Sequence, residues 1–218
     1  MYTKVMSSLQ HRAKVFAALG DPRRLEIVEE LSRSDRTPGE LIEKFEIGSA
    51  LLAHHLDLLE DAGLIERLES HADRRKRFIR LIDRELPYLS PFVAPPNVIF
   101  VCRQNSARSQ LAAAIWRSIV GGQVESAGTK PATQVHPLTL KVASRHQLDL
   151  TTAKPRTFKP NDARGKTVIT VCDQSHDELK TPLSRMHWSM PDPAELGTVT
   201  AFERTFHELV ERIKPLVK

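Results

Sequence analysis

Cysteine is scarce in this sequence of 218 residues, which contains only Cys102 and Cys172. Two cysteines cannot build the framework of several disulfides that holds small secreted domains together. Long apolar runs are also missing, since no stretch approaches the roughly 20 residues of a membrane-spanning helix and MYTKVMSSLQHR has no apolar signal core. We therefore expect a cytoplasmic protein without a membrane segment, whose lone thiols are either small buried hydrophobes or reactive groups.

Basic charge is not in excess in the first half. Residues 1–94 contain 15 Lys and Arg against 16 Asp and Glu, a net charge of −1, whereas residues 95–218 contain 17 against 11, a net charge of +6. Any DNA binding by the first half must therefore depend on local pattern and local charge. Four prolines between residues 87 and 97 interrupt helical and strand patterns. We predict an N-terminal domain over 1–86, a Pro-rich linker over 87–96 and a C-terminal domain over 97–218.

The N-terminal domain is predicted to consist of short helices followed by a basic hairpin. Asp21 and Thr37 each precede a proline, which is the pattern of a capped helix start, and Glu40 completes a capping box with Thr37. The segment 50–70 carries leucines on one helical stripe. The segment HADRRKRFIRLI then predicts a strand pair with a basic tip at Arg74, Arg75, Lys76 and Arg77.

These elements, in this order, describe a winged helix-turn-helix. With LGDPRRLEIVEEL and HHLDLLEDAGLI, residues 8–82 resemble the ArsR/SmtB family of repressors. The resemblance implies a homodimer on a two-fold DNA operator, with the HHL-bearing helix in the major groove and the hairpin on phosphate or the minor groove. The DNA-binding residues it implies are Ser49, His54, His55 and the basic tip 74–77.

Each of these features has a plainer explanation when taken alone. The two histidines would be exposed or core-edge side chains, and the basic tip would be a solvated loop. Family members that sense soft metals usually carry cysteines in this region, and this domain has none. We therefore expect no thiolate metal site there, and we find no spacing of histidines and acids that predicts another metal site.

In the C-terminal domain, the stretch VCRQNSARSQ follows a β-branched and aromatic run and precedes the helix-forming SQLAAAIWRSIV. Cys102 thus lies at a helix N-terminus, where unpaired backbone N–H groups attract anions and favour a thiolate. Arg108 follows six residues later, so the loop can close into a ring that fits a tetrahedral oxyanion. Without such a ring, Cys102 would be a buried residue at the end of a strand.

The signature C-x5-R-S and the later segments VITVCDQSHDEL and HWSMPDPAELG resemble the low-molecular-weight protein tyrosine phosphatase and arsenate reductase superfamily over about residues 97–217. The resemblance implies that Cys102 is the nucleophile, that Arg108 stabilises the oxyanion and that Asp192 is the general acid. Without it, Asp192 would simply form a turn. The residues expected to support the loop are Arg103, Gln104, Asn105, Ser106, Ala107 and Ser109, of which Asn105 and Ser109 would contact the thiolate.

The segments around the Asp-Pro pair resemble arsenate reductases more than phosphotyrosine phosphatases, which commonly place an aromatic residue after it, where this chain has Ala194. Relay enzymes of the reductase branch pair the second cysteine with a third seven residues later, and Leu179 stands there. We therefore expect no bound cofactor, and a small thiol of the mycothiol or glutathione type, with a glutaredoxin-like partner, as reductant. Cys172 is interpreted as an apolar strand residue, with a resolving role as the alternative.

The order of elements predicts a four-stranded parallel sheet with helices on both faces and strands near 98–102, 123–127, 167–172 and 186–189. The resemblance implies that this sheet is of the low-molecular-weight phosphatase type. Two functions remain open. The first is a DNA-binding regulator fused to an active arsenate reductase or tyrosine phosphatase. The second is a regulator whose C-terminal domain only senses an arsenate-type or phosphate-type oxyanion.

Overall fold

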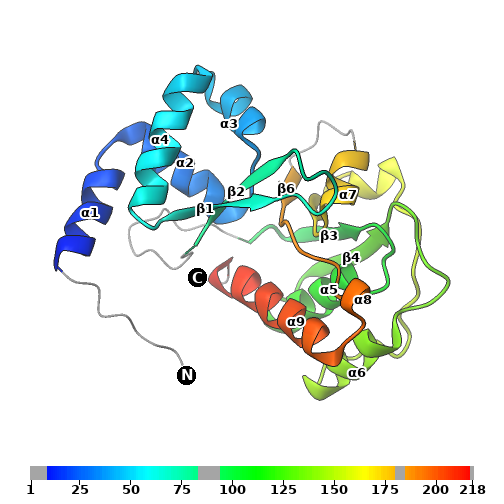
Figure 1. Cartoon of the computed structure of the whole chain (residues 1–218). Coiled ribbons are helices and arrows are strands. Elements are labelled where there is room, and N and C mark those ends of the chain that lie inside the picture. Colours follow the sequence, from blue (N-terminus) through cyan, green and yellow to red (C-terminus); the bar gives the residue numbers. More distant parts are fainter. Residues whose placement is uncertain (1–8, 83–93, 180–184, 217–218) are drawn as a thin grey trace. The chain divides into compact units, whose positions relative to one another are not determined.

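The computed structural model describes residues 9–82, 94–179 and 185–216, which form two compact units (Figure 1). The first unit contains helices and a hairpin, and the second is an α/β unit. Among the described residues, no helix is long and apolar enough to cross a membrane. Most of the Pro-rich linker predicted at 87–96 lies outside the described residues, as do residues 1–8 and 83–86 of the predicted N-terminal domain.

The N-terminal unit begins with helices that start where the sequence predicts. Asp21 caps one helix by accepting a hydrogen bond from the backbone N–H of Arg24 at 3.0 Å. Thr37 and Glu40 form the predicted capping box at the start of the next helix. The elements are α1 (Leu9–Leu19), α2 (Pro22–Arg33), α3 (Pro38–Phe45), α4 (Ser49–Asp61) and the antiparallel strands β1 (Ile65–Glu69) and β2 (Arg77–Leu81).

The hairpin differs from its prediction in its first strand. The sequence placed both strands within residues 71–82, but β1 lies earlier, at the end of the segment predicted to be helical. Gly63, with a φ of 72°, turns the chain out of α4, because glycine adopts this left-handed conformation without steric cost. Ile65 then pairs with Leu81, and both side chains are buried in the core of the unit.

The C-terminal unit contains the predicted parallel sheet. Its four strands lie in the order β4, β3, β5, β6, and each neighbouring pair is parallel. The predicted four-stranded sheet is therefore confirmed. Its elements are β3 (Asn97–Cys102), α5 (Arg108–Ile119), β4 (Gln123–Gly128), α6 (Pro137–Arg145), the 3-10 turn η1 (Pro160–Ala163), β5 (Thr167–Thr170), α7 (Asp173–Glu178), β6 (Arg185–His187), α8 (Pro193–Leu196) and α9 (Val199–Ile213).

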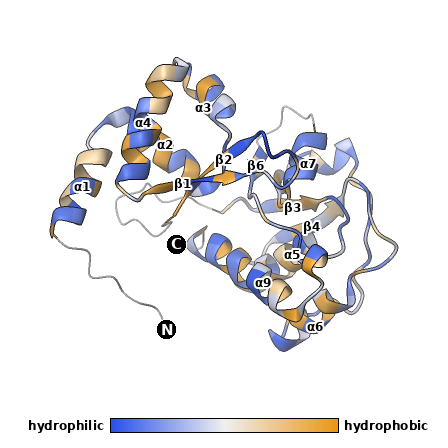
Figure 2. Ribbon diagram, viewed as in Figure 1, coloured by the Kyte–Doolittle hydropathy of each residue, from blue (hydrophilic) through white to orange (hydrophobic). Residues whose placement is uncertain are grey.

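Alternate residues of β3 face two separate apolar clusters. Val98 and Phe100 face the larger cluster, which α5 and α9 complete, while Ile99 and Val101 face a smaller one that includes residues from η1 and the end of α7. α9 shows both hydrophobic and hydrophilic colouring along its length, as an amphipathic helix does (Figure 2). This inner strand is thus buried on both faces. Its last residue, Cys102, lies where the parallel strands have their carboxyl ends.

Candidate active site

The loop between β3 and α5 is held by contacts to the sulfur of Cys102. The backbone N–H of Asn105 donates to Cys102 Sγ at 3.2 Å, and Ser109 Oγ lies 3.0 Å from the same sulfur. Asn105 also donates from its side chain to Ser109 Oγ at 2.9 Å. Its φ of 48° is a left-handed conformation that asparagine tolerates better than most residues. Asn105 and Ser109 therefore contact the thiol, and Cys102 itself is only 2% exposed.

Five consecutive backbone carbonyls of this loop are bonded to groups outside it. The carbonyls of Cys102, Arg103, Gln104 and Ser106 accept from backbone N–H groups of residues 129–136, and that of Asn105 accepts from the Gln110 side chain. Carbonyl oxygens held in this way cannot direct their negative ends at the thiol. The loop thus offers its N–H groups rather than its carbonyls to an anion, as a phosphate-binding loop does.

Gly128 allows the outer segment to approach the loop closely. A Cβ atom at this position would lie 2.7 Å from the carbonyl oxygen of Arg103 and 3.0 Å from the backbone nitrogen of Asn105. Backbone atoms cannot move aside cheaply, so a side chain would separate the two segments. Gly128 ends β4 and pairs with Cys102 across the sheet, so the strand register itself brings the bare backbone against the loop.

Arg108 is the first residue of α5, and its side chain is almost fully buried. It donates from Nη1 to the carbonyl of Met190 at 2.9 Å and from Nη2 to Asp192 Oδ2 at 2.5 Å. Among the residues that the structure describes, its buried Nε has no hydrogen-bond partner. Burial works against the charged guanidinium, but the negative charges of Cys172, Cys102 and Asp192 raise the pKa of Arg108. A charged group with a spare buried donor is suited to bind an anion.

Asp192 has two structural partners. Its Oδ1 accepts from the backbone N–H of Ala194 at 3.0 Å, which caps α8, and its Oδ2 holds Arg108. The turn expected from an Asp-Pro pair is therefore present, and it presents the carboxylate to the guanidinium. The structure thus places the Asp192 carboxylate against Arg108, which begins the helix that follows the loop of Cys102.

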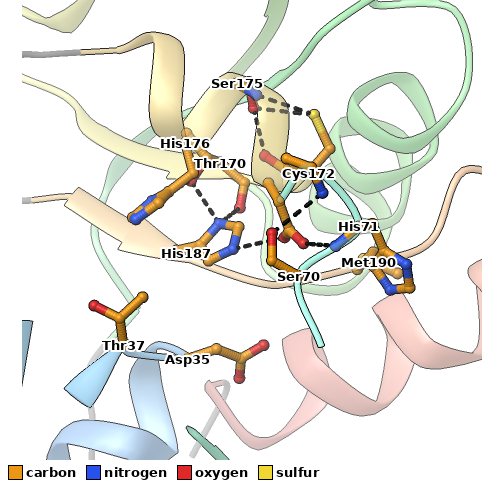
Figure 3. A network of polar contacts seen from close by, with 12 residues as sticks. Asp35, Thr37, Ser70, His71, Thr170, Cys172, Ser175, His176, His187 and Met190 are labelled. Atoms are coloured by element: carbon orange, nitrogen blue, oxygen red, sulfur yellow. Dashed lines mark hydrogen bonds and ion pairs between the residues drawn. The ribbon is translucent and has the colours of Figure 1, made fainter. Parts of the chain in front are cut away.

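Cys172 lies beyond the strand on which the sequence placed it. β5 ends at Thr170, and Cys172 caps α7, with its Sγ accepting from the backbone N–H of Ser175 at 3.4 Å and donating to Ser175 Oγ at 3.2 Å (Figure 3). Burial raises the pKa of the Cys172 thiol; Arg108 opposes this shift, and a negative charge on Cys102 adds to it. Cys172 is therefore within electrostatic range of the loop, which the sequence did not reveal.

A buried polar network fixes the chain on both sides of Cys172. His187 Nδ1 lies 2.9 Å from Thr170 Oγ1 (Figure 3). On the other side of the ring, His187 Nε2 lies 3.0 Å from Asp173 Oδ1. Burial would raise the pKa of Asp173, but the hydrogen bond and the charge of His187 lower it. These contacts link the end of β5, the start of α7 and β6, so the position of Cys172 is well defined.

The remaining loop residues lie at different depths. Ser106 and Ala107 are buried, whereas Gln104 is exposed and Arg103 is partly exposed. Arg103 and Lys130 lie 3.8 Å and 3.4 Å from Glu178 Oε1, so basic side chains flank an acid near this part of the loop.

The predicted DNA-binding residues lie on α4 and in the hairpin. Ser49 and His54 are exposed on α4, and the basic tip 74–77 is exposed as well. His55 does not lie on the surface, because its side chain is only 6% exposed within the helical core. Burial lowers the pKa of His55, although Asp21 opposes the shift. The expectation that His55 faces DNA is therefore wrong, because its side chain is buried. The adjacent His54 is the one that lies on the exposed side of the helix.

Comparisons with known proteins assign both units to families. The model of the bacterial regulatory protein family arsR matches residues 21–67, so the N-terminal unit contains an ArsR-type helix-turn-helix. The C-terminal unit is 33% identical to arsenate reductase 2 of Bacillus cereus over 126 residues, which cover 54% of this chain and 91% of that protein.

Two solved structures share the fold of the C-terminal unit. The tyrosine phosphatase amsI of Erwinia amylovora, at 16% identity, aligns with a TM-score of 0.52 over 57% of this chain and 92% of its own. The arginine phosphatase YwlE of Geobacillus stearothermophilus, at 20% identity, aligns with a TM-score of 0.50 over 56% and 91%. The family model of the low molecular weight phosphotyrosine protein phosphatase matches residues 97–218, and this chain belongs to that family.

Proposed function

We propose that the protein is a DNA-binding transcriptional regulator whose C-terminal domain is a thiol-dependent arsenate reductase. The observation that carries the proposal is the unpartnered buried Nε of Arg108, among the described residues, beside a thiol in a loop whose carbonyls are all engaged elsewhere. Such a site binds a tetrahedral oxyanion and places it against a nucleophile. The choice of arsenate is supported by the 33% identity to a protein named arsenate reductase.

Binding of the oxyanion is proposed to redistribute the contacts of Arg108. The anion takes the Nε donor and competes for Nη2, which in the free protein is bonded to Asp192 Oδ2 at 2.5 Å. Asp192 is thereby released on one oxygen while Ala194 still holds the other. The released carboxylate oxygen takes up the proton that the Cys102 thiol loses on forming a thiolate, and it can then pass that proton to the leaving group.

In the first chemical step, the thiolate of Cys102 forms a bond to arsenic while one arsenic–oxygen bond breaks. The departing hydroxyl leaves as water after taking the proton from Asp192. The loop N–H groups and Arg108 stabilise the charge on the remaining oxygens, which is the function of an oxyanion hole.

Reduction is proposed to use a small thiol rather than an internal relay. The thiol attacks Cys102 Sγ, a sulfur–sulfur bond forms, the sulfur–arsenic bond breaks, and arsenic keeps the electron pair and leaves as arsenite. A second thiol molecule reduces the mixed disulfide and restores Cys102. An internal relay is disfavoured because Leu179 occupies the third-cysteine position and packs against the smaller apolar cluster.

The test is turnover by the full chain with arsenate and a small thiol, with a glutaredoxin-like protein as an additional reductant. We expect arsenite to form in amounts equal to the disulfide produced, and little stimulation by thioredoxin alone. An aryl phosphate is assayed in parallel, because hydrolysis of that compound without arsenate reduction would identify a phosphatase instead. Binding of arsenate without either reaction would leave an oxyanion-sensing regulator.

DNA binding is proposed to depend on the exposed residues Ser49 and His54 for base contacts and on the hairpin tip for phosphate contacts, in a homodimer on a two-fold operator. The sequence of α4 supports this division between base contacts and phosphate contacts, because the helix carries no Lys or Arg. Attraction to phosphate must then come from outside α4, and the basic tip 74–77 is exposed.

Replacing Arg74, Arg75 and Arg77 with alanine is expected to weaken binding to all DNA sequences. The slope of log affinity against log salt should fall by about one unit for each lost phosphate contact. The measurement is a salt titration of binding to specific and nonspecific duplexes. The matched control removes the same charge from the exposed Lys141, Lys154 and Lys159. An unchanged slope in the hairpin variant, or an equal change in the control, would contradict the assignment.

A further inference from the structure

Three potential metal ligands converge at a second place in the C-terminal unit. His146, Glu203 and His207 each offer one nitrogen or oxygen atom, and these three atoms lie within 4.8 Å of one another. None of the three takes part in the loop that holds Cys102. Two imidazoles and one carboxylate form a common ligand set for zinc and similar ions.

Helix α9 supplies two of these residues, and the residue that caps the end of α6 supplies the third. Glu203 and His207 are four residues apart on α9, so they lie on the same side of the helix. His146 caps the end of α6, where its backbone N–H bonds to the carbonyls of Val142 and Ala143. Its ring stacks on Phe206 with centroids 3.6 Å apart and an angle of 12° between the planes. The ring plane is therefore set by packing before any ligand binds.

The carboxylate of Glu203 is oriented from one side. Its Oε1 accepts from Arg145 Nη1 at 3.1 Å, and its Oε2 lies 2.7 Å from His146 Nε2. A hydrogen bond between histidine and glutamate would account for these two residues alone. It does not account for His207, whose ring approaches that of His146 at 5.7 Å and 85°. With His207 as a third potential ligand, the pair of His146 and Glu203 becomes a possible metal site, which is exposed on the side of His207.

We propose that His146, Glu203 and His207 bind a divalent transition-metal ion of the zinc type. The ion replaces the proton between His146 Nε2 and Glu203 Oε2, takes a nitrogen of His207 as third ligand and keeps a water on its exposed side. Ligand atoms around a tetrahedral zinc ion lie about 3.3 Å apart, so the exposed His207 closes the set by a change of rotamer. Arg145 keeps Glu203 monodentate, and its charge moderates the affinity.

The ion would join the end of α6 to α9. The first turn of α6 also supports the loop, because Thr139 Oγ1 and the backbone N–H of His136 both donate to the carbonyl of Ser106. Metal binding therefore stabilises a helix whose other end holds the oxyanion loop, and it should raise the unfolding temperature of the full chain.

The test is a zinc titration of the full chain, in a phosphate-free buffer and in a background where both cysteines are replaced by serine, so that thiolates cannot bind the ion. Competition with a chromophoric chelator measures the affinity. We expect one equivalent to bind, and His207→Ala and His146→Ala each to weaken it by at least about 10-fold. His54→Ala, which removes an exposed histidine from the other unit, is the control and should bind as the parent does.

Cobalt supplies a second readout that does not depend on affinity. Bound Co²⁺ should give the visible absorption of a four-coordinate nitrogen and oxygen site, and His207→Ala, at an exposed position where folding is not at risk, should remove it. The proposal is overturned if the chain binds no zinc, or if both histidine variants bind zinc as tightly as the parent.

Discussion

Cys102→Ser is expected to abolish arsenate turnover, by more than about 10³-fold, because it removes the sulfur that we propose bonds to arsenic. Cys172→Ser is expected to keep turnover within about 10-fold of the parent when a small thiol is the reductant. One physical reason is that Cys172 is fully buried and its thiol is hydrogen-bonded to Ser175. The other is that no cysteine stands at position 179 to accept a relayed disulfide. The measurement is steady-state formation of arsenite by both variants at the same thiol concentration.

Alkylation supplies the control for this comparison. Both thiols are buried, but burial raises the pKa of Cys172, whereas Cys102 lies in the loop before a helix N-terminus. Iodoacetamide near neutral pH should therefore modify Cys102 first, and bound phosphate should protect it. Cys102→Ser should still gain thermal stability from arsenate, which shows that the loop is folded. A Cys172→Ser protein as inactive as Cys102→Ser would instead mean that Cys172 attacks the arsenic adduct, and the small-thiol pathway would have to be abandoned.

Arg108→Ala is expected to eliminate the rise in melting temperature that phosphate, sulfate or arsenate causes in the parent. It should also reduce turnover by about 10² to 10³-fold, the usual cost of losing one oxyanion-stabilising group. The guanidinium supplies the spare Nε donor and a charge that the low polarity of the buried site strengthens. Melting curves with and without tens of millimolar phosphate measure the effect.

Because Arg108 also holds Met190 and Asp192, its loss changes the stability of the free protein. The relevant quantity is therefore the difference in melting temperature between the protein with and without the anion, not the melting temperature of the free protein. Arg108→Lys keeps a charge without the planar set of donors and should recover only part of that difference. Arg103→Ala, at the partly exposed second position of the loop, is the matched control and should keep most of it. An anion effect that survives in Arg108→Ala would place the binding site elsewhere.

Sequence alone predicted the features that local chemistry determines. The caps at Asp21 and Thr37 depend on side-chain acceptors next to the residues they serve, and the four strands depend on short β-branched runs. The loop from Cys102 to Arg108 was also visible, because its spacing lies within one continuous segment.

The predictions that were wrong, and the site that was missed, depended on tertiary packing. The apolar run VITVC does not mark where pairing of β5 ends, so Cys172 was placed on the strand although it caps α7. His54 and His55 are adjacent in sequence, and only packing against the other helices separates an exposed residue from a buried one. The cluster around His146 was missed because Glu203 lies 57 residues further along the chain.

The outward-bonded carbonyls of the loop have a consequence for selectivity. A ring whose shape is fixed during folding recognises charge and tetrahedral geometry, and arsenate and phosphate share both. Such a rigid ring can hardly reject phosphate on entry, so phosphate should act as a competitive inhibitor wherever it is abundant. Discrimination must then arise after binding, because a thiol can reduce pentavalent arsenic but not pentavalent phosphorus. The enzyme would be specific in kcat rather than in affinity, with redox chemistry instead of shape as the filter.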